Sequence, residues 1–122
     1  MKKDNKILII SKAFAVRIIR LFQYLQNEKK EFVLSKQLLR AGTSIGANVR
    51  ESVHAQSSED FIHKLNISLK ESYETEYWLE LLRETEYLNE QQFLSIISDN
   101  KEITATLVKI IKTSKAKTNA KE

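Results

Sequence analysis

The stretch RAGTSIGANVRES, residues 40–52, holds the only two glycines of a 122-residue chain that contains no proline. Glycine costs a helix about 1 kcal/mol relative to alanine, so this stretch is either a loop or a helix that needs its glycines for packing. On a helical wheel, one side carries the glycines together with apolar residues, and the other side is polar. The apolar side holds Leu38, Gly42, Ile45, Gly46, Val49 and Val53, and the polar side holds Gln37, Arg40, Ser44, Asn48 and Glu51. This pattern predicts an amphipathic helix.

Helical periodicity recurs along the rest of the chain, with no segment that alternates like a strand. We expect four helices, at about residues 6–27, 35–55, 58–86 and 90–113, followed by a basic tail over 114–122. Ser57 and Asn89 precede two of these helices as candidate caps, and Gln92 is placed to complete a capping box with Asn89. Short connections make neighbouring helices antiparallel. The predicted fold is all-α, a single-domain antiparallel up-down-up-down four-helix bundle over residues 1–122.

The expected third helix offers small residues as partners for the glycines. If the chain folds back at Ser57, Gly46 would face Ser68 and Gly42 would face Ser72, so that the two backbones could approach closely. In the same register Arg40 would face Glu74. An interhelical ion pair is the simpler interpretation. The alternative is a polar site formed by Arg40, Asn48, Glu71 and Glu74.

Two segments, QLLRAGTSIGANVRES and DFIHKLNISLKESYETEYWLELL, resemble the bacterial four-helix-bundle family named after the 23S rRNA intervening sequence. The positions that carry the resemblance are Gln37, Arg40, Ser44, Ile45, Asn48 and Glu51 in the first segment and Phe61, Leu65, Leu69, Lys70, Glu71, Glu74, Trp78 and Leu79 in the second. The resemblance implies a small bundle that assembles as a homopentamer. It also implies a relationship to the accessory proteins of diversity-generating retroelements, which bind nucleic acid.

Positive charge is concentrated at the two ends of the chain. Residues 1–12 carry four lysines against Asp4, and residues 109–122 carry five lysines against Glu122, whereas the residues between them sum to −3. In an up-down-up-down bundle these two ends lie together, and Arg50 at the end of the second helix joins them. The candidate nucleic-acid-binding residues are Lys2, Lys3, Lys6, Lys12, Arg50, Lys109, Lys112, Lys115, Lys117 and Lys121. Such a surface would neutralise RNA or DNA phosphates without reading sequence. The alternative is a solubilising end.

Motifs for catalysis or cofactor binding are missing from the sequence. Without cysteine the chain can form neither disulfides nor thiolate metal sites, and it contains no phosphate-binding or dinucleotide-binding fingerprint. Glu51 and His54 have the spacing of a metal-binding pair, but Glu51 lies opposite the glycine face, so we expect no metal. We predict no enzyme activity, no cofactor and no small-molecule substrate. No apolar run approaches the ~20 residues of a membrane span, so we expect a cytoplasmic protein without a membrane partner.

Surplus apolar surface predicts self-association. The apolar stripe of the first helix is wider than one core face requires, and Tyr73, Tyr77 and Trp78 lie partly off the core stripe of the third helix. A monomer would expose these residues. We therefore predict a homo-oligomer, and two functions stay open: an RNA-associated accessory protein, or a scaffold or interaction module that contacts only proteins.

Overall fold

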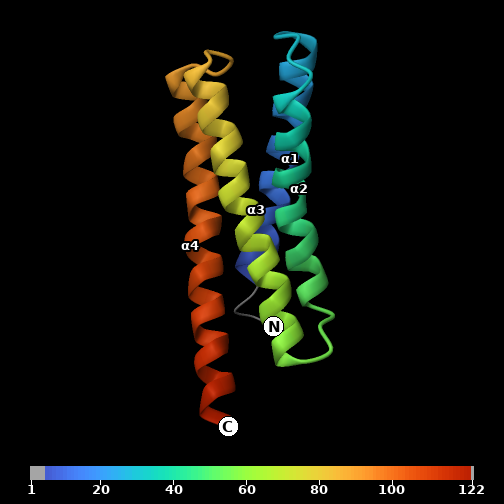
Figure 1. Cartoon of the computed structure of the whole chain (residues 1–122), viewed down its shortest axis with the longest axis vertical. Helices are drawn as coiled ribbons and strands as arrows, with labels where there is room; N and C mark the ends of the chain where they lie inside the picture. The colour runs from blue at the N-terminus through green and yellow to red at the C-terminus, as the bar shows by residue number, and fades with distance from the viewer. Residues whose placement is uncertain (1–4, 122) are drawn as a thin grey trace.

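The computed structural model describes residues 5–121, and this part of the chain folds into four helices with no strand (Figure 1). The helices are α1 (Asn5–Asn27), α2 (Leu34–Ser52), α3 (Ser58–Glu84) and α4 (Glu90–Lys121). The predicted all-α class with four helices is confirmed, and every helix begins within one residue of its predicted start. The main contacts join α1 to α2, α2 to α3, α3 to α4 and α4 to α1, so α1 and α3 lie diagonally across the molecule.

The ends of the helices differ from the prediction more than their starts. Helix α2 ends at Ser52 rather than at residue 55, and α3 ends at Glu84 rather than at residue 86. Helix α4 continues to Lys121 instead of ending at residue 113, so the segment predicted as a tail is helical through residue 121. Its composition explains the extension, since alanine and lysine favour helices and no glycine or proline interrupts them. Figure 1 shows the end of α4 reaching beyond the other helices.

The core combines large apolar side chains with a polar layer in α3 and α4. The buried apolar side chains include Phe14, Ile18, Leu25, Leu65, Leu79, Leu82, Ile97, Ile103 and Leu107. Ile10, Leu21, Phe61, Phe93 and Ile110 are partly buried and pack against them. Ser68 and Ser72 are also fully buried. The Oγ of Ser68 donates to the carbonyl oxygen of Ile45 at 2.8 Å, and the amide of Asn100 donates to the carbonyl oxygen of Ser72 at 3.0 Å. These bonds tie α3 to both of its neighbours and satisfy groups that would otherwise be costly to bury.

The predicted helix over residues 40–52 is confirmed, but its glycines contact a different helix from the one expected. A β-carbon added at Gly42 would lie 2.7 Å from Cγ1 of Ile18, and one added at Gly46 would lie 3.2 Å from the carbonyl oxygen of Ser11. Both neighbours belong to α1, so the glycines let α2 approach α1, whereas Ser68 of α3 reaches the same stretch of α2 through its bond to the carbonyl oxygen of Ile45. The wheel identifies the apolar face of α2 correctly, but this face is shared between two neighbouring helices, and the glycines lie on the α1 side.

Side-chain caps fix the starts of three helices. The Oγ of Ser57 accepts a hydrogen bond from the Asp60 amide at 3.0 Å. Asn89 and Gln92 form the predicted reciprocal box, with distances of 2.7 and 2.9 Å. The start of α2 depends on Glu31, whose carboxylate accepts hydrogen bonds from the backbone amides of residues 33–35. Burial by itself would raise the pKa of Glu31, but these amide donors outweigh it and lower the pKa.

Candidate functional site

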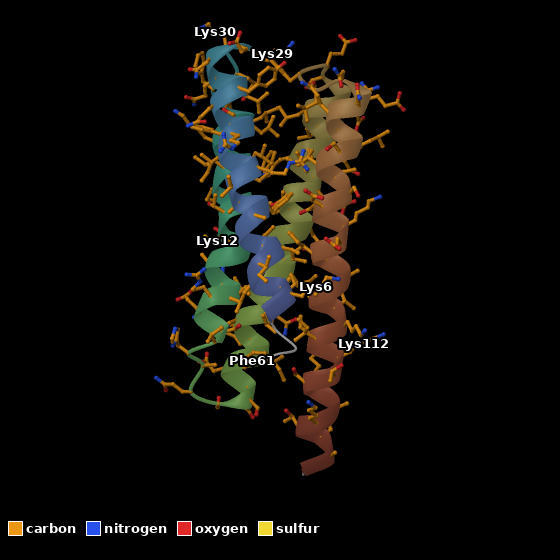
Figure 2. All side chains as sticks on the ribbon, turned by 180° about the vertical axis from the view of Figure 1, so that it is seen from behind. Lys6, Lys12, Lys29, Lys30, Phe61 and Lys112 are labelled. Carbon is orange, nitrogen blue, oxygen red and sulfur yellow. The ribbon has the colours of Figure 1, made fainter. Side chains whose placement is uncertain are left out.

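The predicted basic residues occupy one half of the molecule but lie on several of its faces. Figure 2 shows Lys6 and Lys112 in the half opposite Lys29 and Lys30, with Lys12 near the middle of the molecule. Lys6 and Lys12 project from different sides of α1, because six residues at 3.6 per turn place their side chains about 120° apart around the helix. The predicted single patch is therefore divided. Lys2 and Lys3 lie outside the described residues, as does the side chain of Lys121.

Some of these basic residues lie close to acidic side chains, and others do not. The Nζ of Lys6 lies 3.8 Å from Oε2 of Glu102 in α4, in an exposed pair that contributes little stability. Lys115 borders a shallow hollow between α3 and α4 that also contains Glu59 and His63. Lys109, Lys112 and Lys117 are exposed along α4. These three lysines form no ion pair with any described residue.

Lys12 and Arg50 are brought together by the packing of α1 against α2. Both line one hollow between these helices, which has a volume of about 300 Å³. The prediction that Arg50 lies at the same end as Lys12 is thus met for this pair, although the sequence places the two cations 38 positions apart and does not show that they line one hollow.

A second candidate site lies between α2 and α3, where the residues of the family motif form a polar cluster. Arg40 Nη2 donates to Oε1 of Glu74 at 2.6 Å, and Nη1 donates to Oε1 of Glu71 at 3.4 Å. The indole Nε1 of Trp78 also donates to Oε1 of Glu74, at 3.2 Å. The predicted contact between Arg40 and Glu74 is confirmed. Trp78, one helical turn after Glu74, is a member of the cluster that the register argument missed.

The electrostatics of this cluster are those of a satisfied ion pair. The hydrogen bond from Arg40 lowers the pKa of Glu74, against an opposing effect of burial, and the bond from Trp78 acts in the same direction as Arg40. The hydrogen bonds that Arg40 donates to Glu74 and Glu71 raise the pKa of Arg40. Arg40 and Glu74 therefore stay charged at neutral pH. Oε2 of Glu71 is buried without a hydrogen-bond partner.

The other motif residues do not join the cluster. The Nδ2 of Asn48 donates to the carbonyl oxygen of Ser44 on its own helix at 2.9 Å, and Ser44 donates to Arg40 in the same way. Glu51 lies 4.0 Å from Lys64, and Gln37 is exposed. Residues 5–121 contain no group of three histidine or acidic side chains that could hold a metal ion. The cluster therefore joins α2 to α3.

Two diagonal helices carry exposed apolar side chains. On α1, Ile9, Val16 and Ile19 are 67%, 43% and 41% exposed. On α3, Tyr73 and Tyr77 are 50% and 54% exposed, and the ring of Tyr77 packs edge-on against Trp78 with centroids 5.3 Å apart. We call these sets the α1 stripe and the α3 stripe. No helix of the described chain covers either one.

None of the helices in the described part of the chain is both long and apolar enough to cross a bilayer.

Comparison with known proteins gives the fold and the motif a context. The model of the family described as 23S rRNA-intervening sequence protein matches residues 3–109. This chain is also similar to the crystal structure of a protein of unknown function from the S23 ribosomal protein family of Bacteroides thetaiotaomicron VPI-5482. The two are 60% identical, the match covers 90% of this chain and 98% of that chain, and the TM-score is 0.89. No curated protein matches the sequence. The family resemblance carried by α2 and α3 is confirmed, and the match extends it to α1 and much of α4.

Proposed function

The chain belongs to the 23S rRNA-intervening sequence protein family, and from this premise we propose that it is a non-catalytic protein that binds nucleic acid through its lysine-rich half. The fold proposed for each subunit is an antiparallel up-down-up-down bundle, and the subunits form a homo-oligomer. RNA is the preferred ligand, because the family is named after an rRNA intervening sequence and the resemblance implies a link to accessory proteins that bind nucleic acid.

The observation that carries the proposal is the concentration of cations without acidic partners in one half of the molecule. Lys12, Arg50, Lys109, Lys112 and Lys117 form no ion pair within residues 5–121. Most of them are lysines, whose hydrated ammonium groups neutralise phosphates without a preferred geometry. Binding should therefore follow counterion release and be largely independent of base sequence.

The two exposed stripes support self-association. Since α1 and α3 are diagonal, the α1 stripe and the α3 stripe face in different directions, and one subunit cannot cover its own stripes. A contact between the α1 stripe of one subunit and the α3 stripe of the next is head-to-tail, and such contacts close into rings. A ring of five subunits is the number that the family resemblance implies. It would repeat the lysine-rich half around its circumference.

The proposal is tested by titrating the full chain against fluorescently labelled single-stranded RNA and duplex DNA between 50 and 200 mM salt. We expect binding at low salt that weakens steeply as salt rises, as for several phosphate contacts. A variant with Lys109, Lys112 and Lys117 changed to glutamine should bind more weakly, without a change in melting temperature. Absence of binding to both nucleic acids at 50 mM salt would contradict the proposal.

A scaffold or interaction module is the second candidate function. The exposed aromatic residues Tyr73 and Tyr77 favour it, because such side chains are enriched at protein interfaces. This candidate predicts self-assembly without any affinity for nucleic acid, so the same titration separates the two functions.

A further inference from the structure

The hollow between α1 and α2 has a floor of small side chains and two cationic walls. It is lined by Leu8, Ser11, Lys12, Ala15, Thr43, Gly46, Ala47 and Arg50. Gly46 allows the two helices to approach closely, since a β-carbon there would lie 3.2 Å from the carbonyl oxygen of Ser11. Where the helices meet, the alanine side chains are too small to fill the space between them, and a depression results. Its volume of about 300 Å³ is at the lower end of the range for small-ligand pockets.

The charge of this hollow is uncompensated. No acidic residue lines it, and the side chains of Lys12 and Arg50 make no ion pair or hydrogen bond to any residue of the described chain. By contrast, Lys6, Arg17, Arg40 and Lys64 each have a carboxylate partner. The nearest acid in sequence, Glu51, is placed near Lys64 of α3 instead. Two unpaired cations on one small hollow repel each other, and an anion placed between them would relieve this repulsion.

We propose that this hollow binds a backbone phosphodiester of the nucleic acid, an inference that rests on the proposed function and assigns its anchoring site. Lys12 from α1 and Arg50 from α2 hold the phosphate oxygens from opposite walls. The guanidinium of Arg50 matches two phosphate oxygens at once, and this fixes the orientation of the phosphate more strongly than the lysines of α4 can. The apolar floor of Leu8, Ala15 and Ala47 packs against the adjoining sugar. A nucleic acid strand is the occupant that fits the charges, because unpaired lysines of the same half lie beyond the hollow and can follow the backbone.

The test compares two double variants of equal net charge in the titration with RNA and duplex DNA. Lys12→Gln with Arg50→Gln removes both walls of the hollow. Arg20→Gln with Lys36→Gln removes one arginine and one lysine from the same two helices outside the hollow, at residues that also form no ion pair in the described chain. Losing two phosphate contacts should reduce the slope of log affinity against log salt by about 1.8 on duplex DNA and roughly 1.4 on a single strand. The Arg20 and Lys36 variant should keep the slope of the unmodified protein.

A second pair of variants tests the hollow without removing its cations. Ala47→Glu places a carboxylate on the exposed floor of the hollow, whereas Ser98→Glu places the same charge on an exposed position of α4. Melting temperatures of all four variants should match the unmodified protein, and only Ala47→Glu should weaken binding strongly.

The outcomes separate this inference from the proposed function. If the unmodified protein binds neither nucleic acid, both are overturned. If it binds, but the Lys12 and Arg50 variant keeps its affinity and salt slope, the hollow is not the anchoring site and the proposed function stands. Equal losses in the two double variants would likewise overturn the inference, because they would reflect net charge alone.

Discussion

Gly42 in α2 and Ile18 in α1 pack so closely that a β-carbon on the glycine would lie 2.7 Å from Cγ1 and 2.9 Å from Cγ2 of the isoleucine. Ile18 is completely buried, so its side chain has no free space into which it could move. We expect Gly42→Ala to lower the free energy of unfolding by about 1 kcal/mol, because overpacking of ~1–3 kcal/mol exceeds the ~1 kcal/mol gain in helix propensity. Urea denaturation measures the difference.

The control for this prediction is a double-mutant cycle with Ile18→Ala. Removing the γ-carbons of Ile18 removes the clash, so Gly42→Ala should be neutral or stabilising in that background. An equal loss of stability in both backgrounds would show that the contact with Ile18 is not its cause.

The buried carboxylate of Glu31 should stabilise the start of α2. Glu31→Gln should lower the free energy of unfolding at pH 7 by roughly 1 kcal/mol, comparable to the loss of a helix cap. Because the pKa of Glu31 is lowered by folding, its contribution is fully present above the ordinary value and is lost as pH falls through the lowered pKa. Thermal unfolding between pH 7 and pH 3 should therefore show the two proteins converging in acid. Glu28→Gln, at an exposed site in the same connection, should follow the unmodified protein throughout.

Local patterns in the sequence predict some of the helix caps, whereas the contacts between helices depend on long-range packing. The Ser57 cap and the box of Asn89 with Gln92 involve residues three apart, and both are predictable. The Glu31 cap is equally local, since it spans two to four residues, but it is not predictable because glutamate is not one of the usual N-cap residues. In the basic half, the antiparallel arrangement predicts that Lys12 and Arg50 lie at the same end of the bundle. That the two line one hollow is not predictable, since it depends on which neighbour receives the glycine face of α2.

The turn after α1 offers a stabilising substitution. Lys30 adopts a left-handed backbone conformation, which costs a residue with a β-carbon roughly 1 kcal/mol and costs glycine little. Lys30→Gly should raise the free energy of unfolding by about 0.5–1 kcal/mol, and the melting temperature should rise by a few degrees. The matched change Lys29→Gly removes the same charge at a residue without positive φ, so it should be neutral or destabilising. A lower melting temperature for Lys30→Gly would contradict this account of the turn.

Arg40 should contribute to stability through the two glutamates of α3. In Arg40→Gln, Glu71 and Glu74 lose their common partner, and we expect a loss of about 1 kcal/mol at pH 7, kept small because the Arg40 side chain is 52% exposed. The pKa of Glu74 is lowered mainly by its bond from Arg40, so the difference between the two proteins should shrink as pH falls through that lowered pKa. The emission of Trp78, whose indole bonds to Glu74, reports on the same cluster. Lys70→Gln, at an exposed position of α3, is the control, and a loss that is constant with pH would exclude the ion pair as its origin.

The proposed head-to-tail contact between the α1 stripe and the α3 stripe makes a prediction that a symmetric contact does not. Val16→Glu should disrupt the α1 stripe, and Tyr73→Glu should disrupt the α3 stripe, because both side chains are about half exposed and a charge in an apolar interface is costly. Each variant alone should therefore sediment and scatter light as a single chain of 14.2 kDa, whereas the unmodified protein should form a larger oligomer.

Mixing the two variants distinguishes the geometries. In a head-to-tail contact, the intact α3 stripe of the Val16→Glu chain can bind the intact α1 stripe of the Tyr73→Glu chain, but the resulting pair has only damaged stripes at its two free ends. An equimolar mixture should therefore contain a species of two chains and nothing larger. If the α1 stripe binds only another α1 stripe, Tyr73→Glu leaves the oligomer intact, and mixing adds nothing. A monomeric unmodified protein at micromolar concentration would exclude both geometries, since the stripes would then be stable in contact with water.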